Sequence, residues 1–194
     1  MKRKTITLQF IQNGILLLNN NDIQEYKLKS VDNYKIINKD QFISETTQVL
    51  KDSKINNSLL TDNINIIVDN TYSIIEKDNI TNIFTELSFN KITYLELTKL
   101  FNLKKQELLI DLSTNNIKIY YMNEVIDQKV YFNKYTQILS ILLKNIIEIH
   151  SIKTIKLFGN KCNNKNIISL VEKYSNAEVY IYSHPNQVPI ILLT

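Results

Sequence analysis

The segment from residue 108 to residue 120 reads LLIDLSTNNIKIY and decides the fold that we predict. Two apolar runs, residues 108–110 and 117–120, stand on either side of a short polar stretch. Apolar runs separated by turn-forming residues are typical of two strands joined by a short connection. The carboxylate of the segment, Asp111, falls at the end of the first strand. In proteins that handle nucleotides, such a strand end is a place for a phosphate and its metal ion.

Outward from this segment, hydrophobic periodicity predicts the same order of elements twice: strand, strand, strand, helix, strand, helix, strand. In the first half we expect strands at 4–12, 15–18, 23–30, 64–68 and 92–97, a helix from residue 40 and a helix at 78–87. In the second half we expect strands at 107–111, 116–122, 125–131, 155–158 and 178–182, with helices at 133–149 and 167–174.

Three hairpin-linked strands followed by two crossover units predict a mixed five-stranded sheet with helices on its faces. The predicted fold is therefore α/β, with two lobes of similar architecture at residues 1–106 and 107–194. A chain of 194 residues is long enough for each lobe to bury a core of its own.

Composition excludes several classes of protein. The net charge of +4 is scattered along the chain, whereas a nucleic-acid face needs clustered Lys and Arg, so no nucleic-acid partner is expected. A function in nucleic-acid binding nevertheless stays open as an alternative hypothesis. It would show as a steep salt dependence of the affinity for single- or double-stranded probes. No apolar run approaches the roughly 20 residues of a membrane span. Gln9, Gln12 and Asn13 interrupt the first apolar stretch, which argues against a signal peptide. With its one cysteine, the chain is predicted to be cytoplasmic.

The doubled element order resembles the duplicated ribonuclease H-like fold of the actin-like superfamily. That superfamily includes actins, heat-shock chaperone ATPases, sugar kinases and the bacterial cell-division and pilus-assembly actin homologues. Residues 110–118, IDLSTNNIK, resemble its second phosphate loop, and residues 155–160, IKLFGN, are similar to its adenosine-binding segment. Residues 65–72, NIIVDNTY, resemble its strand and turn before a helical segment.

The resemblance implies a nucleotide cleft, and the residues that match its motifs are Asp111, Ser113, Thr114, Asn115 and Gly159. The cleft departs from the family pattern. When the two halves are aligned by their apolar pattern, Gln9 falls where the second half has Asp111, and the bulky Ile11 falls where it has Ser113. Ser113 itself replaces a glycine, and Gly159 lacks its usual glycine neighbour. Phosphate loops need glycine for close backbone approach and carboxylates for magnesium, so we do not expect ATP hydrolysis.

Size supports the same expectation. Superfamily members that hydrolyse ATP generally carry insertions after the third strand of each half, which form the outer walls of the cleft. Here residues 30–39 and 131–133 leave no room for such a subdomain. An open cleft excludes water poorly, which weakens electrostatic stabilisation of phosphoryl transfer.

Other chemistries find little support. A carboxylate at a strand end is more often a turn residue that accepts backbone N–H groups than a ligand of a metal ion, and Asp111 has this simpler explanation. His150, His184 and Cys162 lack the spacing of metal ligands, so no metal site is predicted. No Gly-x-Ser-x-Gly motif is present. A nuclease of this architecture would need three or four converging carboxylates, and Asp111 has no obvious acidic companions.

We therefore predict a degenerate actin-like protein, a pseudo-ATPase that is not an enzyme and binds no cofactor. It would act as an adaptor or scaffold through protein–protein contacts, with a homodimer as one form, in cell division, cell shape or envelope-machine assembly. The alternative is a protein in which Asp111, Ser113, Thr114 and Gly159 still hold ATP or ADP with magnesium, as a conformational or polymerisation switch.

Overall fold

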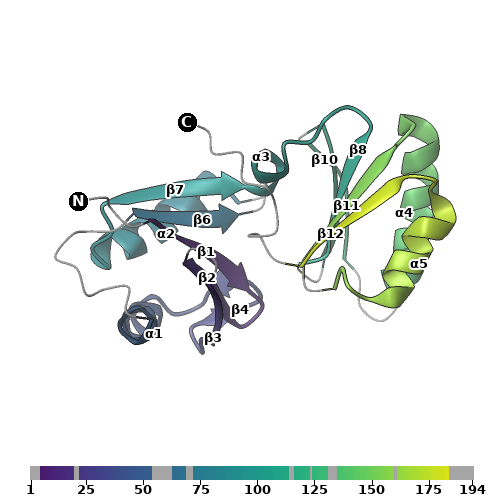
Figure 1. The fold of residues 1–194 in the computed structure, drawn as a ribbon. Coiled ribbons are helices and arrows are strands. Elements are labelled where there is room, and N and C mark those ends of the chain that lie inside the picture. Colours follow the sequence, from purple (N-terminus) through teal and green to yellow (C-terminus); the bar gives the residue numbers. More distant parts are fainter. Residues whose placement is uncertain are drawn as a thin grey trace. The chain divides into compact units, whose positions relative to one another are not determined.

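The computed structural model describes residues 5–19, 22–53, 63–68, 72–113, 116–122, 124–130, 135–159 and 161–183. The chain divides into two compact units, Met1–Leu97 and Thr98–Thr194, which we call the first and second lobes (Figure 1). This division falls inside a short helix, α3 (Leu97–Phe101), whereas the sequence-based boundary lies between residues 106 and 107, just before the first strand of the second sheet.

The first lobe is built on a five-stranded sheet with the strand order β3-β2-β1-β6-β7. Its strands are β1 (Thr5–Ile11), β2 (Gly14–Asn19), β3 (Asp22–Lys27), β6 (Asn63–Val68) and β7 (Lys91–Glu96). β1 pairs antiparallel with β2 and parallel with β6, and β7 extends the parallel part. The predicted mixed sheet is confirmed.

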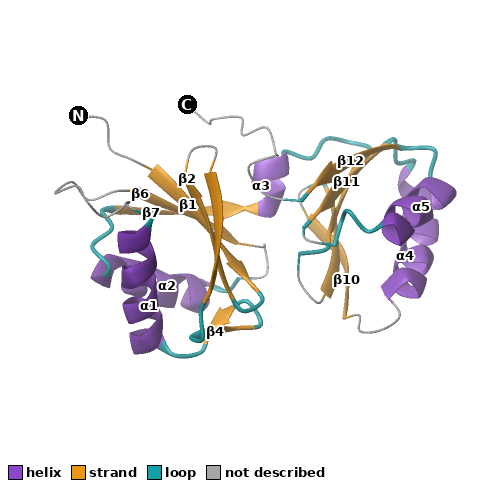
Figure 2. Cartoon of the chain, turned by 60° about the horizontal axis from the view of Figure 1, so that its bottom comes forward, coloured by secondary structure: helices purple, strands orange, loops and turns teal. Residues whose placement is uncertain are grey.

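Both helices of the first lobe, α1 (Lys39–Asp52) and α2 (Ile74–Glu86), cover one face of this sheet (Figure 2). Alternate strand residues such as Ile6 and Leu8 point to that face and are fully buried. Phe42 of α1 and Phe84 of α2 meet above them, with their ring centroids 6.0 Å apart. The alternation of apolar residues along the strands thus produces a single core between sheet and helices.

Helix α2 begins at Ile74, four residues before the predicted start at residue 78. Ser73 and Glu76 form a capping box, in which the Ser73 hydroxyl accepts from the Glu76 N–H and the Glu76 carboxylate accepts from the Ser73 N–H. The start was misplaced because the first two helical residues, Ile74 and Ile75, are apolar yet exposed. Their exposure breaks the apolar stripe that the periodicity argument follows.

Glu76→Gln is expected to lower the free energy of unfolding at neutral pH by less than about 1 kcal/mol, because the carboxylate is partly exposed. The Ser73 backbone N–H, the Lys35 ammonium and the Ser73 hydroxyl lower the pKa of the Glu76 carboxyl to about 2. A lowered pKa stabilises the fold above the ordinary value of 4.5, and this stabilisation is lost as pH falls through about 2.

Urea unfolding of both proteins at neutral and at acidic pH measures the effect. The difference between Glu76→Gln and the parent chain should shrink as pH falls from 4.5 towards 2. Glu172→Gln, on the exposed side of the last helix, is the control and should show neither the loss nor its pH dependence. A pH-independent loss in Glu76→Gln would contradict the capping role of the charge.

The second lobe repeats the design, with the strand order β10-β9-β8-β11-β12. Its strands are β8 (Glu107–Asp111), β9 (Asn116–Tyr121), β10 (Glu124–Val130), β11 (Thr154–Phe158) and β12 (Glu178–Tyr182), and its helices are α4 (Tyr135–His150) and α5 (Lys165–Tyr174). β8 pairs antiparallel with β9 and parallel with β11, as β1 does with β2 and β6. The predicted repeat of element order is confirmed.

The core of the second lobe also lies on one face of its sheet, under α4 and α5. Leu108 and Ile110 of β8 point towards the helices and are fully buried. On the opposite face, Phe101 of α3 packs against Phe158 and Tyr182, with centroid distances of 5.4 and 5.3 Å. Both faces of β11 are therefore covered, and Phe158 is fully buried.

Three short elements were not predicted. β4 (Val31–Asp32) and β5 (Lys35–Ile36) form a two-stranded hairpin between β3 and α1, and α3 follows β7. The hairpin turn places Asn33 and Tyr34 at φ values of 48° and 67°. Asn commonly adopts positive φ, but Tyr does so rarely, so the usual signal of a hairpin turn is missing.

Candidate functional site

The site predicted from the sequence lies at the carboxyl ends of β8 and β11, which are neighbours in the second sheet (Figure 1). Asp111 is the last residue of β8 and pairs with Phe158 of β11 on one side and with Lys118 of β9 on the other. Its side chain is fully buried. A buried carboxylate must be matched by donors or by opposite charge, so its partners define what the site can do.

The first partner of the Asp111 carboxylate is its own loop. Oδ1 accepts from the backbone N–H of Ser113 at 2.9 Å and from the Ser113 hydroxyl at 2.5 Å. This is the turn-stabilising role that the sequence offered as the alternative to metal binding. The Ser113 N–H, which the resemblance assigns to a phosphate, is used within the protein.

Two lysines share the surroundings of Asp111. Lys118 stands directly opposite it in the β8–β9 pair, so both side chains project from the same face of the sheet, and Lys118 is 3% exposed. Lys161 lies after β11, where burial lowers the pKa of its ammonium while the negative charge of Asp111 acts in the opposite direction. Ammonium groups around a carboxylate disfavour a divalent cation beside it and suit an anion better.

Gly159 closes the space between the two strand ends. Its φ is +107°, and a Cβ at this position would lie 2.3 Å from the Ser113 nitrogen and 2.7 Å from the Leu112 carbonyl carbon. The Leu112 N–H donates to the Phe158 carbonyl at 2.7 Å, and the Gly159 N–H donates to the Tyr182 carbonyl at 3.0 Å. Glycine is thus needed here for the approach of one loop backbone to another.

The structure therefore brings Asp111, Ser113 and Gly159 together. Thr114 and Asn115, the other two candidate residues, lie outside the described residues. Besides Lys118, three neighbours were not singled out as site residues from the sequence, namely Lys161, Cys162 and Ser183. The Cys162 thiol is buried, which raises its pKa, and its sulfur lies 3.6 Å from the Ser183 hydroxyl. Only their position just after β11 and β12 could have indicated them.

In the first lobe, the position that corresponds to Asp111 is occupied by an uncharged residue, Gln9. Gln9 pairs with Leu16 and Asp111 with Lys118, so in both hairpins the partner lies seven residues further along the chain. This common register agrees with the superposition that set Gln9 opposite Asp111. The Gln9 side chain is 8% exposed and carries no charge at neutral pH. The first lobe thus supplies no carboxylate at this strand end.

Among the residues that the structure describes, no three His, Cys, Asp or Glu side chains gather in a way that could hold a metal ion. Within the same residues, none of the helices has the length and apolar character needed to cross a membrane.

The doubled sheet-and-helix architecture has clear counterparts among solved structures. Ethanolamine utilization protein EutJ from Carboxydothermus hydrogenoformans superposes with a TM-score of 0.64 at 7% identity, over 97% of this chain and 88% of that one. A Bacteroides thetaiotaomicron protein with an actin-like ATPase fold and unknown function gives 0.56 at 11% identity, over 96% and 95% of the two chains. The chain has the actin-like ATPase fold.

Other proteins with this actin-like fold are more distant or longer. MreB5 of Spiroplasma citri, bound to ADP, gives a TM-score of 0.50 at 10% identity, over 77% of this chain and 58% of that one. The putative N-acetylglucosamine kinase of Porphyromonas gingivalis gives 0.52 at 6% identity, over 94% and 96%. The sequence matches no protein-family model and no curated protein. The likeness is therefore one of fold, shared by proteins with different functions.

Proposed function

We propose that this actin-like protein performs no phosphoryl transfer and acts as an adaptor or scaffold through contacts with other proteins. The observation that carries the proposal is the state of the Asp111 carboxylate, which is buried and bonded to its own loop through Ser113. A carboxylate that orders magnesium must present its oxygens to the ion and its waters. Oδ1 of Asp111 instead stabilises the turn after β8.

Three further features of the lobes support the proposal. Gln9 occupies the strand end that corresponds to Asp111, so the two lobes together offer one carboxylate at these positions. Lys118 and Lys161 surround that carboxylate with positive charge. Gly159 packs on the Ser113 backbone, which uses the space that a phosphate-binding glycine keeps open.

Calorimetric titration of the whole chain with Mg-ATP tests the proposal, and we expect no binding tighter than about millimolar. The alternative function, a nucleotide-dependent switch, draws support from Lys118 and Lys161, which could neutralise phosphate charge without a metal. Binding tighter than about millimolar that disappears in Asp111→Ala would overturn the adaptor proposal in favour of the switch.

Asp111→Ala is expected to lower the free energy of unfolding by about 1–3 kcal/mol, because it removes the acceptor of two donors of Ser113 in a buried turn. Urea unfolding followed by circular dichroism measures the change. Gln9→Ala, at the corresponding position of the first lobe, is the matched control and should cost less because Gln9 carries no charge to be compensated. Equal losses in the two variants would show that the turn does not depend on the carboxylate.

Fold analogy alone names cell division, cell shape or envelope-machine assembly as the process in which such an adaptor would act. A second copy of the chain is among the partners that the proposal admits. Affinity capture from the native cell with the whole chain as bait, followed by mass spectrometry, identifies the partner. Recovery in the same bait of a nucleotide-processing activity that depends on Asp111 would argue against a scaffold.

A further inference from the structure

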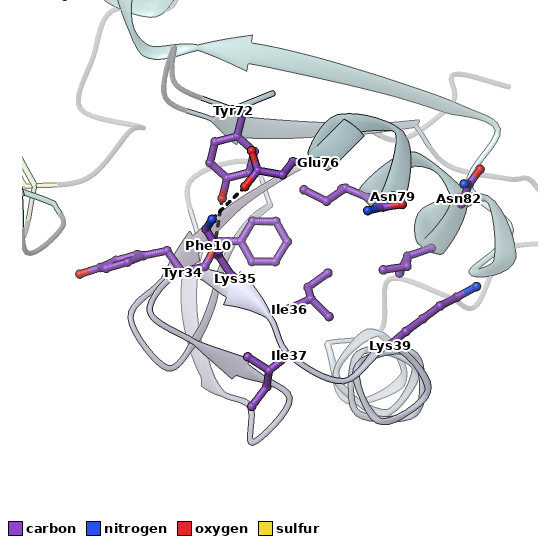
Figure 3. A pocket seen from close by; sticks show the side chains of 12 residues that line it. Phe10, Tyr34, Lys35, Ile36, Ile37, Lys39, Tyr72, Glu76, Asn79 and Asn82 are labelled. Atoms are coloured by element: carbon purple, nitrogen blue, oxygen red, sulfur yellow. Dashed lines mark hydrogen bonds and ion pairs between the residues drawn. The ribbon is translucent and has the colours of Figure 1, made fainter. Parts of the chain in front are cut away.

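A pocket opens on the first lobe between the β4–β5 hairpin and helix α2, well separated in sequence from Asp111. We call it the hairpin–helix pocket. Its volume is about 400 Å³, within the range of cavities that bury small ligands or short peptide segments. Figure 3 shows its lining, with the Phe10 ring and Ile36 near the centre of the view and Asn79, Asn82 and Lys39 to their right.

Helix α2 presents two parallel rows of side chains to this pocket. Glu76, Ile80 and Ile83 follow the spacing of one helical row and line the pocket. Asn79 and Asn82 form a second row that also lines it, and Ile75 precedes Asn79 by four residues, so it extends this second row. The Ile75 side chain is 73% exposed, and Ile37 on the hairpin side is 64% exposed. Exposed isoleucines beside an apolar hollow are typical of an interaction surface.

The charges around the pocket compensate each other. The Lys35 ammonium lies 2.9 Å from the Glu76 carboxylate, and Lys39 forms an ion pair with Glu86. The first pair joins the hairpin to α2 and the second joins the start of α1 to α2. The two glutamates are ten residues apart on α2, which corresponds to about 15 Å. Since each cation already faces an anion, a charged ligand would gain little here. The lining favours an uncharged occupant of mainly apolar surface.

The polar groups that remain suit a peptide backbone. The carboxamides of Asn79 and Asn82 make no hydrogen bond to other groups in the described part of the chain, and each offers a donor and an acceptor. Across the pocket, the Ile37 N–H donates to the Ser30 carbonyl at 2.8 Å. Because pairing alternates in antiparallel strands, the N–H and C=O of Ile36 point away from β4. Peptide groups of an extended segment match both kinds of partner.

We propose that the hairpin–helix pocket binds an extended, uncharged segment of a partner protein whose apolar side chains alternate with exposed ones. The proposal rests on the adaptor function proposed above and names the surface through which it acts. Alternate side chains of the segment enter the pocket over Phe10 and Ile80, while its backbone bonds to Asn79 and Asn82. Ile37 and Ile75 cover the rest of the segment.

Selection of a displayed library of random dodecapeptides against the whole chain tests the proposal. We expect the selected peptides to share apolar residues at alternate positions and to lack charge between them. One selected peptide, synthesised with a fluorophore, then serves as the probe for anisotropy titrations. Ile37→Asp and Ile75→Asp should each weaken its binding about tenfold or more, because they place a charge against an apolar contact.

Ile74→Asp is the matched control. Ile74 is in the same helical turn as Ile75 and is 78% exposed, but it belongs to a different row, with Asp78 and Thr81, that does not line the pocket, so binding should stay within about twofold of the parent chain. Equal weakening by Ile74→Asp, a charged consensus, apolar residues at helical spacing, or no selected peptide would each overturn the proposal. Failure of the adaptor function would appear instead as Mg-ATP binding at the second lobe, which these titrations do not measure.

Discussion

Gly159→Ala is expected to lower the free energy of unfolding of this protein by about 2–6 kcal/mol. Two costs add at this position. A side chain at φ +107° strains the backbone by about 1–3 kcal/mol, and the new Cβ would lie 2.3 Å from the Ser113 nitrogen, a clash whose relief costs about 1–3 kcal/mol more. The atoms that the new Cβ would meet belong to the backbone of Ser113 and Leu112, so no side chain can rotate away to relieve the contact.

Urea unfolding followed by circular dichroism gives the size of the effect, and hydrogen exchange locates it. Exchange should accelerate in β8 and β11, where the Leu112 N–H donates to the Phe158 carbonyl. Lys173→Ala, on the exposed side of α5 in the same lobe, is the control and should change the free energy by no more than about 0.5 kcal/mol. A loss below about 1 kcal/mol in Gly159→Ala would mean that a phosphate could enter the space beside Ser113.

The strands were predictable because their apolar residues alternate and their ends carry turn residues. The 178–182 strand was placed at its observed bounds, and β6 and β11 differ from prediction by a residue at one end. The start of α2 was also recoverable, since Ser73 and Glu76 have the spacing of a capping box. It was missed because Ile74 and Ile75 are apolar where the helix faces solvent. Apolar residues that face solvent, such as Ile74 and Ile75, therefore mislead a prediction of helix bounds that follows the apolar stripe.

The proximity of three candidate residues was predictable, whereas the groups around them were not. The motif order placed Asp111, Ser113 and Gly159 at neighbouring strand ends, and the structure joins them. Which groups compensate Asp111 could not be predicted, because Lys118 stands between Ile117 and Ile119, and alternation alone would point it to solvent. The register of β8 and β9 instead buries it opposite the carboxylate. The alternation of polar and apolar residues along one strand does not show which groups from other elements pack against that face of the sheet.

The two lobes differ at the strand ends where the sequence predicts a nucleotide site. In the second lobe, the Asp111 carboxylate and the Gly159 backbone both lie against Ser113. In the first lobe, the corresponding strand end carries Gln9 and no carboxylate, and the region between β3 and α1 forms the hairpin that borders a pocket. The same fold can therefore keep its cores while its polar surfaces change their role, because sheet and helix packing depends on the buried faces alone.

Phe42→Ala tests that dependence in the first lobe and is expected to lower the free energy of unfolding by about 3–5 kcal/mol. Phe42 is fully buried, and its ring centroid lies 5.9 Å from that of Phe10 and 6.0 Å from that of Phe84. Truncation removes the ring that joins the sheet to both helices and leaves a cavity that the rigid strands cannot fill. Urea unfolding measures the loss, and hydrogen exchange should accelerate in α1 and α2.

Phe42→Leu is the matched control, since it keeps an apolar side chain of similar reach and should cost about half as much or less. The peptide probe adds a second readout. Phe10 lines the hairpin–helix pocket and also contacts Phe42, so Phe42→Ala should weaken probe binding in the folded protein, whereas Phe42→Leu should preserve it. If Phe42→Ala lowers stability but leaves probe binding unchanged, the pocket does not depend on the packing of Phe42, and Phe10 serves only the core.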